Sequence, residues 1–250
     1  MSERESYPTG VPCWVDNLVP DPERAMSFYG ELFGWEFDGP GPGDYYVAKV
    51  RGRDVAGVGQ APPGVSAGWN TYVSVASVDD AARAAGRVIV EPFDVLPAGR
   101  LAALEDPGGG VIGVWEPADR HGCQLINEAS AYAMSALHTS DPDAAGRFYC
   151  EVFGWETESF APGVSLFRLP GYVGGEPAQP VPRDVVAVMA RDDGPDRWSV
   201  DFWVTDADAL ADKAVGLGGS VVVPPFDSMP KRQAVLADPF GAAFSVSTAP

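Results

Sequence analysis

Asp16 is the first residue of this chain that could do chemistry. It lies in the segment 11–19, whose alternation predicts a strand with Trp14 and Asp16 on the same face. A carboxylate on an apolar strand is costly unless it is hydrogen-bonded or paired. Asp16 could therefore orient a ligand hydroxyl or amine, or act as a base with a raised pKa. The structural alternative is that strand-end amides, or an arginine such as Arg53 or Arg100, satisfy the carboxylate.

His138 is the second acid–base candidate. The chain has only two histidines, and His121 lies in a polar stretch whereas His138 lies near the end of a predicted strand, on the face of Met134. His138 could move a proton near neutral pH. With Asp201 it would form at most a two-point metal site, which is fewer ligands than metal ions in proteins require. The structural alternative is a hydrogen-bonded residue at a strand end.

Aromatic and hydrogen-bonding residues gather in two further predicted strands. They are Trp69, Asn70, Tyr72, Trp198, Ser199, Asp201 and Trp203. Neighbours along a strand face opposite ways, so only part of each set can meet one ligand. Core packing explains any single tryptophan, whereas the whole set suits a flat aromatic ligand.

Other kinds of chemistry have little support. The chain lacks a GxSxG, a Walker loop and a GxGxxG between strand and helix. Its three cysteines, Cys13, Cys123 and Cys150, form no CxxC pair and are interpreted as buried or idle thiols. The net charge of −18 argues against a nucleic-acid partner. No apolar run approaches the roughly 20 residues of a membrane span, and the N-terminus is too polar for a signal peptide, so we expect a cytoplasmic protein without membrane partners.

A repeat organises the elements that must position these residues. The nonapeptide FYGELFGWE recurs 120 residues later as FYCEVFGWE, with seven of nine positions identical. Each copy ends a predicted helix that begins at a DP pair, because Asp21 or Asp141 can cap the first turn and proline fits the first helical position. Gly34 and Gly154 are predicted to end the helices in the left-handed conformation, with a tryptophan folding back behind each.

The same order of elements recurs four times. Each unit contains a strand, a helix and three strands, with apolar periodicity in each helix and alternation in each strand. We expect a first domain over residues 1–116, a linker over 117–130 and a second domain over 131–250.

The recurring motifs resemble those of a known superfamily. Four βαβββ units, an opening strand ending in (V/T)xDP, a helix ending in FYxxxFGW and a late DPxG turn are similar to the vicinal oxygen chelate superfamily, which includes glyoxalase I, bleomycin-resistance proteins and extradiol dioxygenases. The tandem arrangement resembles an actinobacterial glyoxalase-like group often labelled hydroxylase. The resemblance covers nearly the whole chain and implies an α+β fold of tandem domains, each with two units forming a half-open barrel around a concave pocket.

The resemblance also implies where a metal ion would be held. Its ligands come from the first strand, the opening strand of the second unit and the last strand. Counted from the motifs, these positions are occupied by Trp14, Asn70 and Gly113 in the first domain and by Met134, Ser199 and Ser245 in the second. None is His or Glu, so neither set suits a divalent ion, and we expect no metal and no other cofactor.

The sequence thus favours a metal-free relative of the glyoxalase and bleomycin-resistance proteins. It would bind a small aromatic or polyketide-like metabolite, for sequestration or resistance, in pockets lined by Trp14, Asp16, Asn70, Tyr72, Met134, His138, Ser199 and Asp201. One alternative is an isomerase, lyase or oxygenase/hydroxylase that acts on such a metabolite in secondary metabolism, either with Asp16 or His138 as acid or base or with a cofactor that the sequence does not encode. Another is a degenerate enzyme kept as a protein-interaction module. We expect a monomer or a homodimer.

Overall fold

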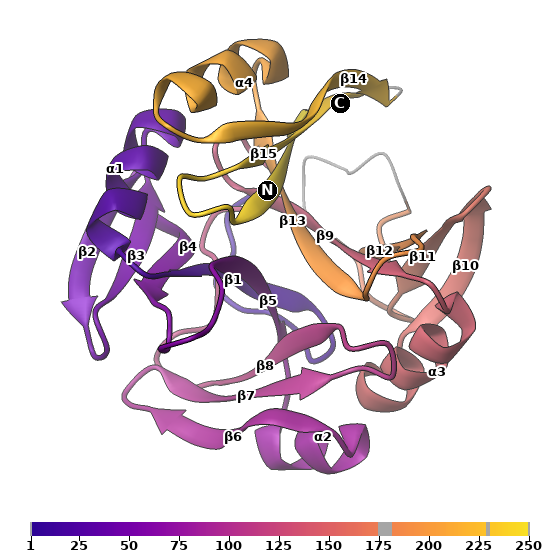
Figure 1. The fold of residues 1–250 in the computed structure, drawn as a ribbon. Coiled ribbons are helices and arrows are strands. Elements are labelled where there is room, and N and C mark those ends of the chain that lie inside the picture. The colour runs from indigo at the N-terminus through magenta and orange to yellow at the C-terminus, as the bar shows by residue number, and fades with distance from the viewer. Residues whose placement is uncertain (1, 175–181, 229–230, 250) are drawn as a thin grey trace.

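The computed structural model describes residues 2–174, 182–228 and 231–249 and contains two eight-stranded sheets (Figure 1). The first sheet has the order β2-β3-β4-β1-β5-β8-β7-β6, and the second has the matching order β10-β11-β12-β9-β13-β16-β15-β14. This confirms the expected α+β fold of two tandem half-barrels. The exact domain boundaries stay a prediction. In the described part of the chain, no helix is long and apolar enough to span a bilayer.

The four units have the expected order of elements. The strands of the first sheet are β1 (Pro12–Val19), β2 (Glu36–Gly41), β3 (Tyr45–Val50), β4 (Arg53–Gln60), β5 (Gly68–Ser74), β6 (Val88–Val95), β7 (Gly99–Glu105) and β8 (Val111–Pro117). Those of the second are β9 (Tyr132–Thr139), β10 (Glu156–Ala161), β11 (Val164–Arg168), β12 (Val185–Arg191), β13 (Arg197–Val204), β14 (Ser220–Ser228), β15 (Lys231–Ala237) and β16 (Ala243–Thr248). The helices are α1 (Pro22–Phe33), α2 (Val78–Ala85), α3 (Pro142–Phe153) and α4 (Ala207–Gly216).

The repeated helices begin and end as predicted. The Asp21 side chain accepts a hydrogen bond from the backbone N–H of Arg24 at 3.1 Å, and Asp141 caps α3 in the same way. Gly34 and Gly154 have φ values of 74° and 71°, which are left-handed conformations that glycine adopts without strain.

Each sheet is built around two antiparallel central strands. In the first sheet β1 pairs antiparallel with β5 and parallel with β4, so that α1 and the strands β2 and β3 lie within the crossover between two parallel neighbours. The second sheet repeats this with β9, β13 and β12. Alternation along β1 and β9 then separates a face that carries the helices from the opposite face, which is called the inner face below.

The helix-bearing faces of the two sheets pack against each other. Figure 1 shows α1 beside α4 and α2 beside α3, so each helix of the first half lies next to one of the second half. Thr71 of β5 and Ser135 of β9 meet between the sheets, with 2.6 Å between their hydroxyl oxygens. Both hydrophobic clusters of the protein therefore contain residues from both sheets.

The DPxG turns join the two halves through the repeated tyrosine. The Tyr29 hydroxyl of α1 donates to Oδ2 of Asp238 at 3.1 Å, and the Tyr149 hydroxyl of α3 donates to Oδ2 of Asp106 at 2.9 Å. Asp238 lies in the last hairpin of the second sheet, and Asp106 lies in the last hairpin of the first. The helix with the FYxxxFGW motif in each half therefore contacts the DPxG turn of the other half.

Strands β6 and β14 both contain proline. They continue through Pro92, Pro224 and Pro225, because both are edge strands with register irregularities that tolerate a missing N–H donor.

The segment predicted as a linker is packed against the first sheet. Cys123 and Leu125 are buried, and the backbone N–H of Cys123 donates to the Cys13 carbonyl at 2.8 Å.

Candidate functional site

The strand register shows which residues of the first inner face lie level with one another. Trp14 of β1 is opposite Tyr72 of β5, and Tyr72 is the parallel partner of Gly113 of β8. Asn70, which was counted into this row from sequence motifs, is instead opposite Asp16. The expected position of Asn70 was therefore wrong, because motif spacing along one strand does not determine its register against another strand.

The second inner face has the same register with different residues. Met134 of β9 is opposite Asp201 of β13, and Asp201 is the parallel partner of Ser245 of β16. Ser199, the residue counted into this row, is opposite Ala136. The central position of the row therefore carries a carboxylate.

Aromatic rings fill the first inner face. A side chain at Gly57 would overlap the Tyr45 hydroxyl, and one at Gly113 would overlap the ring of Tyr72. The two glycines are thus places where a tyrosine ring lies directly on the strand backbone. A glutamate at position 113 could not coexist with Tyr72 in its present position.

Asp16 is at the centre of this aromatic cluster and is 4% exposed. Its Oδ1 accepts a hydrogen bond from Asn70 at 2.8 Å, and its Oδ2 accepts from the hydroxyls of Tyr72 at 3.0 Å and Tyr45 at 3.1 Å. The Trp14 indole N–H in turn donates to the Tyr45 hydroxyl at 2.8 Å. The predicted residues Trp14, Asp16, Asn70 and Tyr72 therefore meet, and Tyr45, which sequence reasoning missed, completes the cluster.

Burial dominates the protonation of Asp16. It raises the pKa of the carboxyl to about 6, although the three hydrogen bonds act in the opposite direction. The proposed arginine partners are wrong: Arg53 bonds to Glu3 and Arg100 to Asp94. Neutral donors satisfy this carboxylate instead, which leaves its affinity for a proton high.

The second inner face is less buried than the first at two of three matching positions. The positions that match Trp14, Asp16 and Leu18 in β1 carry Met134, Ala136 and His138 in β9. Trp14 and Asp16 are buried, whereas Met134 and Ala136 are half-buried, and Leu18 and His138 are both half-buried. The smaller Met134 and Ala136 side chains therefore leave more of the second face exposed.

His138 forms a pair with a serine on that face. Its Nε2 lies 2.9 Å from Oγ of Ser199, which is also 3.3 Å from the carbonyl of Ala136. Burial, followed by the positive charge of Arg197, lowers the pKa of His138 below its ordinary value of 6.5. The imidazole is therefore neutral at pH 7 and can accept a proton.

Asp201 has one satisfied oxygen and one unsatisfied oxygen. Its Oδ2 accepts from the Ser247 hydroxyl at 2.6 Å, while Oδ1 is buried without a hydrogen-bond partner among the described residues. Burial raises the pKa of this carboxyl. Lys231 lies nearby, with Nζ 5.0 Å from the centre of the Trp203 ring, and burial lowers its pKa. No repeated motif indicated Lys231, because the matching position of the first repeat is Gly99.

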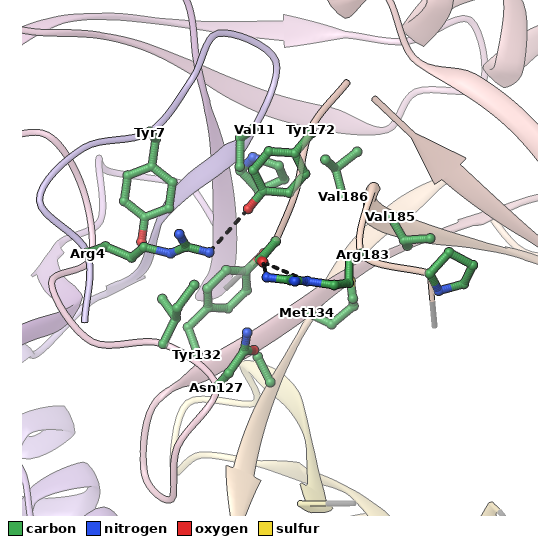
Figure 2. Close-up of a pocket in the computed structure, with 15 residues that line it drawn as sticks. Arg4, Tyr7, Val11, Asn127, Tyr132, Met134, Tyr172, Arg183, Val185 and Val186 are labelled. Carbon is green, nitrogen blue, oxygen red and sulfur yellow. Dashed lines mark hydrogen bonds between the residues drawn. The ribbon is translucent and has the colours of Figure 1, made fainter. Parts of the chain in front are cut away.

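A small pocket opens beside Met134 (Figure 2). It has a volume of about 50 Å³, and its walls include Arg4, Tyr7, Tyr132, Met134, Tyr172 and Val186. These residues come from the N-terminal segment, β9, the β11–β12 connection and β12. Of these residues only Met134 was a sequence candidate, since contacts of the N-terminal segment depend on the folded arrangement. A wider hollow of about 180 Å³ lies against β10–β12 and the start of α3, but no predicted site residue lines it.

The metal ion that the fold suggests does not fit these residues. In the first sheet the row across the central strands consists of Trp14, Tyr72 and Gly113. In the second sheet the matching row consists of Met134, Asp201 and Ser245, which supply a thioether, a carboxylate and a hydroxyl. Divalent ions in such sites need several carboxylate, imidazole or thiolate ligands. Across residues 2–174, 182–228 and 231–249, no three His, Cys, Asp or Glu side chains gather closely enough to hold one.

A family model and known proteins are similar to this chain in sequence. A family model described as a glyoxalase-like domain matches residues 134–247. CFP32 of Mycobacterium tuberculosis, whose name assigns it provisionally to the glyoxylases, is 39% identical over 266 residues, covering 98% of this chain and 97% of CFP32. The anthracycline biosynthesis protein DnrV of Streptomyces peucetius is 31% identical, covering 96% of this chain and 94% of DnrV.

Two solved structures show the same architecture at low sequence identity. The Mn(II)-bound glyoxalase from Novosphingobium aromaticivorans superposes with a TM-score of 0.65 at 16% identity, covering 96% of this chain and 82% of the glyoxalase. The 2,3-dioxygenase LapB from Pseudomonas sp. KL28 gives 0.66 at 13% identity, covering 96% and 93%. With two tandem half-barrels and full-length relatives above 30% identity, this chain belongs to the glyoxalase-like proteins of the vicinal oxygen chelate superfamily.

Proposed function

We propose that the protein binds a small, flat, aromatic metabolite of polyketide type on the inner face of its second sheet, without a metal ion. The observation that carries this proposal is the contrast at matching positions. Trp14 and Asp16 on the first inner face are buried, with the tyrosine rings lying on the strand backbone, whereas Met134 and Ala136 on the second are half-buried. Among the described residues, Oδ1 of Asp201 on the second face has no hydrogen-bond partner.

The side chains of the second face favour a ring that carries polar substituents. The Met134 thioether is a polarizable surface for an aromatic ring. Ser199 and Ser245 offer hydroxyls, and Oδ1 of Asp201 can accept a hydrogen bond from a ring hydroxyl. Such a contact would offset the cost of the buried, unpaired oxygen.

The relatives support the same class of ligand. DnrV is named for anthracycline biosynthesis, and anthracyclines contain fused aromatic rings with hydroxyl and carbonyl substituents. The 31% identity extends over 96% of this chain, so both sheets are included in the match. Sequestration and chemical conversion would both begin with binding on this face.

Calorimetric titration with 2-(hydroxymethyl)anthraquinone tests the proposal. The full-length protein should bind this neutral probe. Met134→Trp, which places an indole where the first sheet has Trp14, should abolish binding. Asp201→Asn should weaken the binding of 2-hydroxyanthraquinone, which has a ring hydroxyl, about tenfold, the cost of a hydrogen bond to a charged group. Asp193→Asn, an equal charge change on an exposed residue, should leave the affinity unchanged. Absence of binding to the wild type, or binding that survives Met134→Trp, would contradict the proposal.

The contact between His138 and Ser199 favours a second candidate function, proton transfer to and from a bound ketone. A neutral imidazole hydrogen-bonded to a hydroxyl can remove a proton next to a carbonyl. The protein should then speed deuterium exchange at the α-carbon of 1-tetralone in D₂O, followed by NMR. His138→Gln should reduce this rate about a hundredfold, whereas His121→Gln, a change at the exposed second histidine, should not. Exchange no faster than in buffer would exclude this role.

A further inference from the structure

We infer that the pocket beside Met134 binds an anionic group, so that the ligand of the second inner face is an acidic aromatic compound. This inference rests on the proposed function and names a chemical feature of its ligand. The pocket is small, it contains a cationic side chain, and it adjoins the proposed ring-binding face at Met134 (Figure 2).

Arg4 is the residue that carries the inference. It is half-buried, and within the described part of the chain it takes part in no ion pair. Among the described residues, its buried Nε has no hydrogen-bond partner, and one terminal nitrogen reaches the Tyr172 hydroxyl only at 3.5 Å. Figure 2 shows the guanidinium group of Arg4 entering the pocket and directed at Tyr172.

The state of Arg4 contrasts with that of most other arginines in the described part of the chain. Acidic residues outnumber basic ones by 35 to 17, and most of the other arginines pair with carboxylates, as Arg100 does with Asp79 and Arg232 with Asp208. Burying a guanidinium without an anion costs free energy that a bound carboxylate would offset. Arginine also matches carboxylate geometry with two parallel hydrogen bonds.

The surroundings of Arg4 favour the same kind of group. The Tyr172 hydroxyl can donate to an anion that also contacts Arg4. Arg183 also lines the pocket, and its Nη2 donates to the Gly174 carbonyl at 2.6 Å. No Asp or Glu is among the described residues that line the cavity.

The size of the cavity decides which part of the ligand it can hold. A cavity must offer roughly 10–15 Å³ to hold one water molecule. The pocket, with about 50 Å³, therefore admits a few waters or one carboxylate-sized group but not a fused ring. The ring must therefore lie outside, against the inner face that begins at Met134. An aromatic acid would thus span the two sites.

Two matched probes test the inference by calorimetry. Anthraquinone-2-carboxylate should bind the wild-type protein at least about ten times more tightly than neutral 2-(hydroxymethyl)anthraquinone, although the net charge of −18 repels anions. Arg4→Gln should bring the ratio of the two dissociation constants close to one. Arg4→Lys, which keeps the charge but not the bidentate geometry, should give an intermediate ratio.

The controls separate this inference from the proposed function. Arg147→Gln removes an equal charge from the exposed side of α3 and should keep the full preference for the acid. If the wild type binds both probes equally, or if Arg4→Gln retains the preference in a folded protein, the anionic subsite is wrong while the ring-binding face stands. If neither probe binds the wild type, both proposals fail.

Discussion

Two buried carboxylates on the inner faces differ in what surrounds them. Both oxygens of Asp16 accept hydrogen bonds from side chains of the first sheet, so this carboxylate has no free position for a ligand while Tyr45 and Tyr72 stay in place. Oδ1 of Asp201 has no hydrogen-bond partner among the described residues, and the Asp201 side chain is half-buried. Because an unsatisfied buried acceptor gains most from a new donor, Asp201 is the better candidate for ligand recognition.

Asp16→Asn should change how stability depends on pH. The folded-state pKa of about 6 is higher than the ordinary value of 3.8, so the folded protein binds this proton more tightly than the unfolded chain. The stabilisation from the proton is complete below pH 3.8 and is lost as the pH rises to about 6. The difference in unfolding free energy, variant minus wild type, should therefore rise by about 3 kcal/mol between about pH 3.5 and 7.

Urea denaturation at a series of pH values measures this difference. Asp193→Asn, at an exposed carboxylate, provides the control and should follow the wild-type curve. A stability difference between Asp16→Asn and the wild type that stays constant across the range would mean that Asp16 does not titrate as its burial implies.

Part of the candidate site could be predicted residue by residue. Alternation along β1 and β5 correctly put Trp14, Asp16, Asn70 and Tyr72 into one cluster, because the period of two is a local property of a strand. The roles of Tyr45 and Arg4 could not be predicted in that way. They depend on which distant strands or segments come together, and the sequence pattern does not specify this.

At the scale of elements, the sequence predicted best where local signals are strong. Caps, an apolar stripe and a terminal glycine placed α1 and α3, and their tryptophans stack on Tyr29 and Tyr149 with ring centres 5.6 Å and 5.5 Å apart. The other two helices lack the DP cap and the terminal FGW motif, and their lengths differ, with 8 residues in α2 and 10 in α4.

Strands β6 and β14 and the connection between the sheets were harder to predict from sequence. Proline argues against a strand unless the strand is an edge, and edge position follows from the order of the whole sheet. The connection lacks apolar periodicity, yet Cys123, Leu125 and Ile126 are buried against the first sheet. An irregular segment can be well packed without any periodic signal, so its burial becomes visible only in the fold.

At the scale of the whole molecule, each hydrophobic cluster is shared between the two sheets. The ring of Phe202 in the second sheet lies 5.0 Å from that of Trp69 and 5.3 Å from that of Phe33 in the first half. In the other cluster Tyr149 and Trp155 pack with Val73 and Leu104. Neither half can bury its helix-bearing face alone, because the partner sheet supplies the other side of each cluster.

The protein should therefore unfold in a single transition that involves both sheets. Tyr149→Phe removes a hydroxyl that donates to Asp106 in the first half and accepts from Trp198 at 2.9 Å in the second. It should lower the free energy of unfolding by about 1–3 kcal/mol, since a buried carboxylate oxygen and an indole N–H lose a partner. Because the clusters are shared, the Tm values measured by tryptophan fluorescence and by circular dichroism should fall by the same amount.

Tyr46→Phe, which removes a hydroxyl with no hydrogen bond in the described structure, is the control and should change stability by less than about 0.5 kcal/mol. Two separate transitions, with Tyr149→Phe moving only one of them, would show that the halves are stable independently and that the shared clusters do not couple them.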